Sequence, residues 1–277
     1  MWEQSDVLNR TPPKADARIH YAAGESQFGD LWVPDGAKKP LPVIVFLHGG
    51  WWQAEYGLEY AGHLCAAFKK AGVAVWSLEY RRVGEAGGGW PNTFLDVAAG
   101  ANYLGTLSKK YPLEVNSVVT MGHSAGGHLA LWLAGRHHVD HSSAIYAPTQ
   151  LPLRGVVSLA GAVDLRLVCD LAQGKFAHDK DEVRSLMGGL PAEFPDRYRA
   201  GSPGDLLPLN VQQVLIQGTE DGQIPPDLPR RYAENARRQG DEVVVKMIPG
   251  AGHFEVVDPQ SVVFDVVRAA GLALLKS

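Results

Sequence analysis

The amino-acid sequence predicts an α/β fold in which a mostly parallel sheet carries helices on both faces. Short apolar runs rich in β-branched residues alternate along the chain with segments whose apolar residues recur at helical spacing. The chain also holds 31 glycines and 18 prolines, more than long helices tolerate, so many tight turns must join short elements. Because α/β folds often reach 277 residues as a single unit, we expect one domain over residues 1–277.

The first half of the predicted sheet begins with a hairpin. Residues 17–34 show alternating apolar positions around a Gly-Glu-Ser turn, a pattern typical of two antiparallel strands. Continuous apolar runs at 43–47 and 73–78 predict strands that are buried on both faces. The segment between them has helical spacing and ends at Gly72, a natural helix terminator. Pro91 opens the next predicted helix.

The second half continues the alternation and contains one interruption. A strand at 117–121 runs directly into the sequence GHSAGG and then into a helix rich in leucine and alanine. The later elements are strands at 155–161, 213–218 and 243–248 and helices at 228–238 and 262–275. Residues 164–209 are polar, contain glycine and proline, and predict an insertion of short helices and turns. Since ligands bind at the carboxyl ends of parallel strands, we expect this insertion to form a small lid over that edge, and the alternative is a decoration without a role.

Composition and charge exclude several classes of function. A formal net charge of -4 argues against nucleic-acid binding, which requires a concentrated basic face. No apolar run is long enough for a membrane span, and the N-terminal segment lacks the apolar stretch of a signal peptide. Cys65 and Cys169 are too few for a disulfide scaffold and favour free thiols. We therefore expect a cytoplasmic protein.

The strongest local motif is Gly122-His123-Ser124-Ala125-Gly126, which follows a predicted strand and precedes a predicted helix. Glycines at these positions allow a strained turn that lifts the serine hydroxyl clear of the sheet. The start of the helix supplies free N–H groups and partial positive charge where an oxyanion would develop. The motif predicts that Ser124 is a nucleophile and that the amide of Ala125 belongs to an oxyanion hole. The alternative is a plain glycine-rich turn.

A nucleophilic serine needs a base, and the base needs an acid to orient it. His253 lies in the loop PGAGHFE after the strand at 243–248, and loops at strand ends are where catalytic side chains gather. Glu220 and Asp221 follow the strand at 213–218, and both are candidates for the acid. The order serine, acid, histidine is the one that accompanies this type of nucleophile turn.

A further motif, His48-Gly49-Gly50-Trp51-Trp52, directly follows the strand at 43–47. The two glycines allow backbone N–H groups to face inward and complete an oxyanion hole with the amide of Ala125. His48 is expected to be a structural hydrogen-bonding residue. Trp51 and Trp52 could belong to the core, but beside an oxyanion hole they also suit a substrate pocket for flat or apolar acyl groups.

These motifs resemble those of α/β-hydrolases of the esterase and lipase type. The sequences HGGWWQ (48–53) and GHSAGGHLA (122–130) resemble the arylformamidase, or kynurenine formamidase, branch, which is marked by HGG-x-W. The segment 79–97 resembles the Y-R-L…P…D stretch of relatives similar to hormone-sensitive lipase and feruloyl esterase. The sequence departs from these relatives at Gln217, where they usually carry histidine, and at Arg82, which replaces leucine.

The resemblance implies roles for individual residues. GTEDGQIP resembles the pattern G-x-x-D-x-x-V-P, which implies that Asp221 rather than Glu220 is the acid, and PGAGHF implies that His253 is the base. The oxyanion donors of the family fall on the amides of Gly50, Trp51 and Ala125.

The sequence therefore predicts a serine hydrolase, independent of any cofactor or metal, that cleaves carboxylic esters of short-chain or aromatic acids. The first alternative is an arylformamidase acting on N-formylkynurenine or a similar aryl formamide. A metal-dependent hydrolase is a second alternative, because residues 137–141 (HHVDH) gather three histidines and an aspartate. An inactive homologue with a binding role is a third. The expected partner is a small-molecule ester or amide; homodimers are common in such folds, but no feature of the sequence specifies one.

Overall fold

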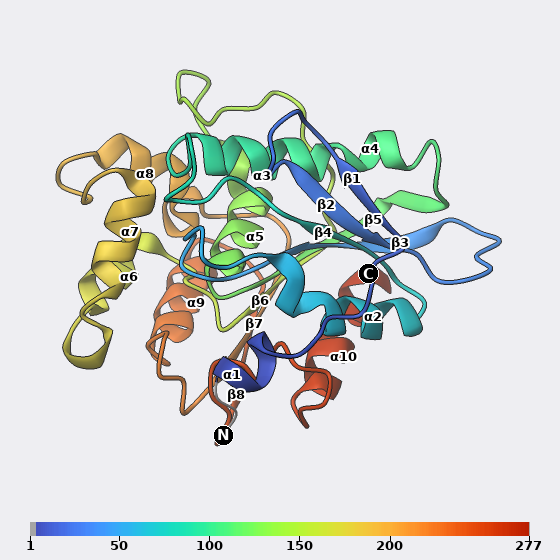
Figure 1. Cartoon of the computed structure of the whole chain (residues 1–277). Helices are drawn as coiled ribbons and strands as arrows, with labels where there is room; N and C mark the ends of the chain where they lie inside the picture. The colour runs from blue at the N-terminus through green and yellow to red at the C-terminus, as the bar shows by residue number, and fades with distance from the viewer. Residues whose placement is uncertain (1–3, 277) are drawn as a thin grey trace.

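The computed structural model describes residues 4–276, and within them an eight-stranded sheet forms the centre of the molecule (Figure 1). The strands are β1 (Ala17–His20), β2 (Phe28–Trp32), β3 (Leu41–Leu47), β4 (Ala74–Leu78), β5 (Leu113–His123), β6 (Gly155–Leu159), β7 (Gln212–Gly218) and β8 (Val243–Ile248). They lie in the order β1-β2-β4-β3-β5-β6-β7-β8. The pairs β1–β2 and β2–β4 are antiparallel and all other pairs are parallel, which confirms the predicted mostly parallel sheet.

Helices cover both faces of this sheet, as the alternation of strand and helix predicts. The α-helices are α1 (Gln4–Leu8), α2 (Gly62–Lys70), α3 (Asn92–Asn102), α4 (Leu104–Leu107), α5 (Ala125–Gly135), α6 (Leu165–Leu171), α7 (Asp179–Met187), α8 (Pro195–Gly201), α9 (Leu228–Arg238) and α10 (Phe264–Lys276). Short 3₁₀ turns lie at Leu58–Ala61, Arg136–His138, Gly174–Phe176 and Pro203–Leu206. Figure 1 shows α3 and α5 on one face and α2 and α10 on the other.

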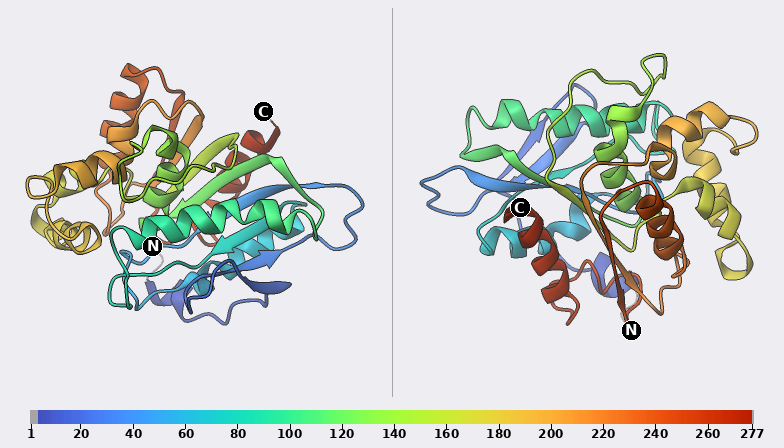
Figure 2. Two further views of the ribbon diagram at one scale, coloured as in Figure 1. Left: turned by 90° about the horizontal axis from the view of Figure 1, so that it is seen from above. Right: turned by 180° about the vertical axis from the view of Figure 1, so that it is seen from behind.

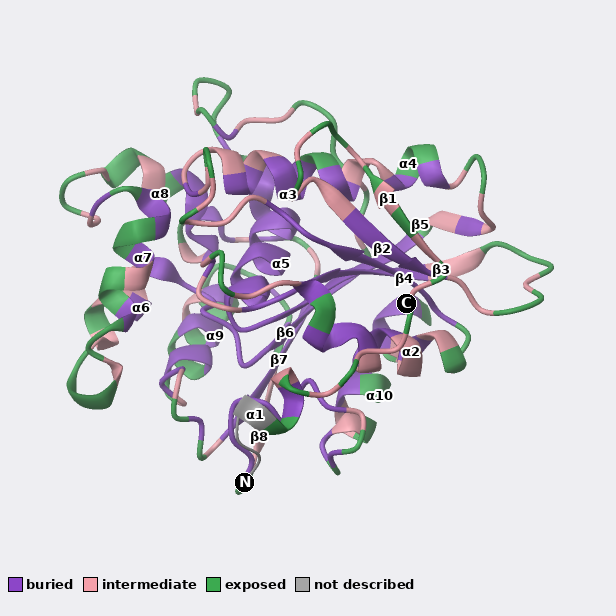
Figure 3. Cartoon of the chain, viewed as in Figure 1, coloured by how far each residue is buried: buried purple, intermediate pink, exposed green. Residues whose placement is uncertain are grey.

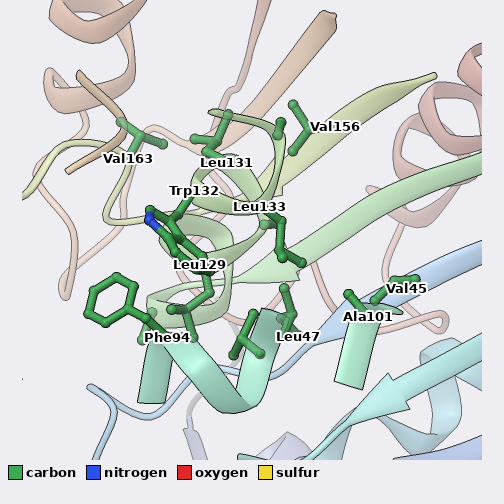
Figure 4. Close-up of a cluster of buried hydrophobic side chains, with 14 of the residues drawn as sticks. Val45, Leu47, Phe94, Ala101, Leu129, Leu131, Trp132, Leu133, Val156 and Val163 are labelled. Atoms are coloured by element: carbon green, nitrogen blue, oxygen red, sulfur yellow. The ribbon is translucent and has the colours of Figure 1, made fainter. Parts of the chain in front are cut away.

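The alternation of side chains along β3 explains how one strand serves two cores. Val43, Val45 and Leu47 pack into the cluster on the face of α3 and α5, which Figure 4 shows in close-up. Ile44 and Phe46 pack into a second cluster with residues of α2 and α10. Because successive side chains of a strand point to opposite faces, a continuous apolar run is what a strand buried on both faces requires.

Helix α5 is completely buried, and it fixes the position of the residue that precedes it. All of its residues are buried, and the ring of Trp132 packs edge-on against that of Phe94 with their centroids 5.0 Å apart. Full burial of a large apolar side chain such as Leu129 contributes about 1.5–3 kcal/mol to folding. The start of α5 is therefore held firmly against the end of β5.

The element bounds differ from the sequence-based expectations in a few places. Strand β5 begins at Leu113 instead of residue 117, and the helix that Pro91 opens divides near Tyr103 into α3 and α4. Helix α1 was not expected at all, because five residues are too few to show a helical period. Helix α9 and strand β8 lie at the predicted positions.

The interruption between β6 and β7 is an insertion of short helices, as predicted, and comprises α6, α7, α8 and two 3₁₀ turns. It lies to one side of the sheet in both views of Figure 2, and its outer surface is exposed (Figure 3). Its inner surface carries fully buried side chains, including Val183 and Tyr198, that belong to the cluster on the α5 face. The amide of Trp90 also donates a hydrogen bond to the carbonyl of Leu186 in α7 (2.8 Å). The insertion is therefore packed onto the sheet domain.

None of the helices within residues 4–276 combines the length and the apolar character that a membrane span requires.

Candidate active site

Ser124 lies in a sharp turn between β5 and α5, where the backbone is strained. Its φ of 55° and ψ of −121° are rare for any residue other than glycine. A Cβ atom on Gly122 would lie 2.0 Å from the carbonyl oxygen of Gly126, and one on Gly126 would lie 2.0 Å from that of Leu47. Only glycine fits at these two positions. The strained turn expected from the sequence is present.

His253 and Asp221 form a buried pair at the ends of β8 and β7. Nδ1 of His253 lies 2.8 Å from Oδ2 of Asp221. Because a carboxylate can only accept, Nδ1 carries the proton and Nε2 is left as the basic nitrogen. Glu220, the other candidate left open by the residue pattern, is exposed and lies 3.5 Å from the hydroxyl of Thr219. The structure therefore pairs His253 with Asp221.

The carboxyl group of Asp221 is stabilised in its charged form. Its Oδ1 accepts hydrogen bonds from the backbone N–H groups of Gln223 (2.7 Å) and Ile224 (2.9 Å). Burial by itself raises the pKa of Asp221, but the interaction with His253 and these hydrogen bonds outweigh it and hold the pKa below its ordinary value. The group is thus an anion that can stabilise a protonated imidazole.

Gln217 supplies a further donor that sequence reasoning did not identify. Its side-chain Nε2 donates to Oδ2 of Asp221 at 2.7 Å, so the carboxylate accepts hydrogen bonds from four groups. Gln217 is one of the two positions, with Arg82, at which this sequence departs from the pattern that it resembles. The sequence offers one indication of this role, because Gln217 lies near the end of a buried strand, four residues before Asp221.

The loop after β3 has an unusual backbone conformation and carries backbone amides that are free of hydrogen bonds among the described residues. Gly50, Trp51 and Trp52 all have positive φ (107°, 50° and 58°), so three successive residues occupy the left-handed region. A Cβ atom on Gly50 would lie 2.3 Å from that of Tyr56, so glycine is required there. Within the described part of the chain, the N–H groups of Gly50, Trp51 and Ala125 donate no hydrogen bond. These are the three amides that the resemblance assigns to an oxyanion hole.

A cavity of about 300 Å³ is shared by residues of the three loops just described. Ser124 and His253 both line it, and so do Gly50 and Trp51. The other lining residues, mostly aromatic or apolar, are Leu8, Tyr56, Tyr60, His123, His178, Gln223 and Phe254. The cavity is therefore a compact pocket with the candidate nucleophile and base in its wall.

Trp52 does not line this cavity, in contrast to the expectation that both Trp51 and Trp52 line a substrate pocket. Its side chain is 0% exposed, belongs to the core cluster and packs edge-on against His128 with the ring centroids 5.3 Å apart. Trp51 and Trp52 both have positive φ, and their indoles contact each other edge-on with the ring centroids 6.0 Å apart. Trp51 alone is a wall residue, and its indole contacts the ring of His178 from the insertion (5.7 Å between centroids).

The other histidines singled out in the sequence have structural partners. Nε2 of His48 lies 2.8 Å from Oε1 of Glu79, and its ring stacks on Tyr80 at 4.5 Å. In the segment HHVDH, Nδ1 of His137 and Nε2 of His138 lie 2.9 Å and 2.8 Å from backbone carbonyl oxygens. Across residues 4–276 no three histidine, cysteine, aspartate or glutamate side chains are arranged to hold a metal ion. Cys65 and Cys169 are free thiols.

The sheet order, the strained turn after β5 and the acid and histidine after β7 and β8 define an α/β-hydrolase fold. The fold is shared with a solved structure described as a truncated form of a carbohydrate esterase from gut microbiota, with a TM-score of 0.80, 22% identity and coverage of 96% of this chain and 98% of that chain. The chain belongs to the BD-FAE family, whose model matches residues 30–234.

Two curated relatives extend the comparison. Esterase LipC of Mycobacterium tuberculosis is 28% identical over 90% of this chain, and a kynurenine formamidase of Salmo salar is 22% identical over 87%. The chain spans 64% of the length of LipC and 75% of the formamidase.

Proposed function

We propose that the protein is a serine esterase that hydrolyses carboxylic esters of short-chain or aromatic acids. The observation that carries this proposal is the shared cavity, whose wall holds Ser124 on its strained turn, His253 with its partner Asp221 behind it, and Gly50 and Trp51 with their free amides. The names of the relatives agree with ester chemistry, since one is an esterase and a protein of the same fold is a carbohydrate esterase.

The arrangement supports an acyl-enzyme mechanism. Nε2 of His253 takes the proton of the Ser124 hydroxyl as the oxygen attacks the ester carbonyl carbon, and Asp221 stabilises the resulting imidazolium. The amides of Gly50, Trp51 and Ala125 donate to the tetrahedral oxyanion, and each such donor typically contributes about 3 kcal/mol. The C–O bond to the alcohol breaks as His253 returns the proton to the leaving oxygen. Water activated by the same imidazole then hydrolyses the acyl-serine, releases the acid and regenerates Ser124.

The size and lining of the cavity favour compact or flat acyl groups. A volume of about 300 Å³ is at the small end of ligand pockets in proteins. Trp51, Tyr56 and Phe254 present aromatic rings, which bind flat groups through apolar contact and offset stacking. Such a volume favours short acyl chains over long ones.

An arylformamidase is the second candidate, supported by the HGG-x-W sequence at residues 48–52 and by the similarity to the salmon formamidase. The same nucleophile and oxyanion donors serve an amide carbonyl, and a formyl group is the smallest acyl group. The two functions differ only in which carbonyl the pocket accepts.

A substrate panel separates the candidates. We expect kcat/KM to be highest for p-nitrophenyl esters of short acids or for a feruloyl ester, and to fall as the acyl chain lengthens beyond the cavity. A preference of about a hundredfold or more for N-formylkynurenine, equivalent to roughly 2.7 kcal/mol, would replace the esterase by the formamidase. Ser124→Ala provides the background rate.

Dialysis against a chelator tests the metal-dependent alternative. It should leave the rate unchanged, whereas a loss of activity that zinc restores would support a metal-dependent hydrolase.

A further inference from the structure

A chain of buried hydrogen bonds connects three loops of the active site. The backbone N–H of Gly49 donates to the hydroxyl oxygen of Tyr60 at 2.7 Å. That hydroxyl lies 2.8 Å from Nδ1 of His123, and Nε2 of His123 lies 3.0 Å from the backbone carbonyl oxygen of His253. The chain thus runs from the oxyanion loop through the turn of the nucleophile to the loop of the base.

The direction of every hydrogen bond in this chain is determined. A carbonyl oxygen can only accept, so Nε2 of His123 carries its proton and Nδ1 is the acceptor. The Tyr60 hydroxyl therefore donates to His123 and accepts from Gly49. Burial, reinforced by the neighbouring imidazole of His253, lowers the pKa of His123 to about 3. Burial also raises the pKa of Tyr60, so both side chains stay neutral near pH 7 and keep these roles.

The two ends of this series of hydrogen bonds, at Gly49 and at His253, are the places where catalysis needs precise geometry. Gly49 immediately precedes Gly50 and Trp51, so the bond to its amide orients the peptide groups that carry the oxyanion donors. The bond to the carbonyl of His253 fixes the backbone from which the catalytic imidazole projects, and the rings of His123 and His253 lie 4.7 Å apart between centroids. Misplacement of a catalytic group by about 1 Å can cost a hundredfold in rate.

We propose, resting on the proposed function, that Tyr60 and His123 are positioning residues. They hold the oxyanion hole and the catalytic histidine in a fixed position relative to each other, a link that we call the coupling. Tyr60 is 8% exposed and His123 is 1% exposed, so water does not replace their hydrogen bonds. Replacement of the Tyr60 hydroxyl leaves both the Gly49 amide and Nδ1 of His123 without a partner, which loosens both ends together.

The test is Tyr60→Phe against a matched control, Tyr232→Phe. The hydroxyl of Tyr232 is also buried and donates to Oε1 of Gln213 at 2.9 Å, at the opposite end of β7 from the cavity. We expect Tyr60→Phe to lower kcat on p-nitrophenyl acetate by about 10- to 100-fold with little change in KM. Tyr232→Phe should keep the wild-type kcat even where both variants lose similar stability in thermal unfolding. Equal kcat values for the two variants would overturn the proposal.

A transition-state analogue provides a readout that a purely structural role would not change. Phenylboronic acid adds to the serine oxygen and forms a tetrahedral adduct that needs both the oxyanion donors and the imidazole. Its inhibition constant should rise in Tyr60→Phe by the same factor by which kcat/KM falls. An unchanged inhibition constant would contradict the coupling.

Substitutions of His123 keep the proposal testable if Tyr60→Phe folds poorly. His123→Asn retains one donor and one acceptor, whereas His123→Leu retains neither. We expect the asparagine variant to keep at least about tenfold more activity than the leucine variant, and equal activities would count against the coupling. Labelling by a fluorophosphonate distinguishes a failure of the proposed function from a failure of the coupling alone. Wild-type protein that is not labelled contradicts the proposed function itself, whereas a labelled wild type with an equally fast Tyr60→Phe contradicts only the coupling.

Discussion

Two buried aspartates near the cavity, one at the edge of the sheet and one in the insertion, differ sharply in their surroundings. Asp221 after β7 is 1% exposed and Asp179 at the start of α7 is 0% exposed. Asp221 accepts hydrogen bonds from four groups, whereas the oxygens of Asp179 accept none within the described residues. The nearest cationic or basic partner of Asp179 is Nε2 of His178, at 3.3 Å.

As a result, the pKa values of the two carboxyl groups shift in opposite directions. The pKa of Asp221 lies below its ordinary value although burial opposes this, because His253 and the amide donors favour the anion. Burial, reinforced by the charges of Asp221 and Glu182, raises the pKa of Asp179 to about 7. Similar burial thus gives an anion paired with His253 in one region and a carboxyl group that resists ionisation in the other. Donors in the surrounding loops decide the difference.

The largest expected effect comes from removing the charge of the paired aspartate. Asp221→Asn should lower kcat/KM on p-nitrophenyl acetate by about 10³- to 10⁴-fold, because the amide neither stabilises the imidazolium nor holds the useful tautomer. Asp179→Asn should change the same constant less than about threefold, since Asp179 contacts none of the reacting groups. Losses of equal size in the two variants would remove the distinction between the two carboxyl groups.

The second expected effect is on stability. The pKa of Asp179 in the folded chain, about 7, exceeds that of an unfolded aspartate, so between roughly pH 4 and 7 the folded state retains a proton that the unfolded state has lost. The stability of the wild type therefore falls as pH rises through this window and stays low above it. Asp179→Asn should be more stable by about 1–3 kcal/mol in urea unfolding at pH 8, with the gain shrinking towards pH 4. A gain that is the same at both pH values would contradict this assignment, and Asp181→Asn, on the exposed side of the same helix, is the control.

The third expected effect concerns the donor that the sequence did not reveal. Gln217→Leu removes a charge-assisted hydrogen bond to Asp221 and should lower kcat/KM by about tenfold. Gln213→Leu is a matched control, because Gln213 lies on the same strand and donates to another buried carboxylate, Asp241, at 2.9 Å. We expect the control to lose stability but keep its kcat. A control that loses as much activity as Gln217→Leu would mean that the effect is general to the strand.

The smallest expected effect lies at the contact between the two regions. Nε2 of Gln53, just after the oxyanion loop, donates to Oε2 of Glu182 in α7 at 2.6 Å. Because both side chains are only half-buried, Gln53→Ala should change KM by about two- to fivefold and leave kcat nearly unchanged. A large fall in kcat would show that the insertion helps to hold the oxyanion loop in place.

The features that could be predicted from the sequence are those that local steric constraints determine. Gly122 and Gly126 are fixed by close backbone approach, and that constraint appears in the sequence as a motif around Ser124. Helix α9 and strand β8 lie where the alternation of apolar strand segments and helical segments predicts them. The choice between Glu220 and Asp221 needed either the resemblance or the geometry, since both residues occupy the same turn.

Contacts between distant segments could not be found in the same way. Tyr60 and His123 are 63 residues apart, and nothing in either segment indicates that their side chains meet. Trp52 is buried while Trp51 lines the cavity, although the two are adjacent and both have positive φ, so the sequence pattern alone does not separate their roles. Asp179 resembles any polar residue of an insertion until the packing of α7 against the sheet domain is known.

The attack of Ser124 under the control of His253 is tested most directly by covalent labelling. The protein is treated with a fluorophosphonate, digested and analysed by mass spectrometry, beside His253→Ala treated in the same way. We expect a single adduct on the peptide that contains Ser124 in the wild type and at least about a thousandfold slower labelling in His253→Ala. An adduct on a different residue, or labelling of His253→Ala at the wild-type rate, would contradict the assignment of nucleophile and base.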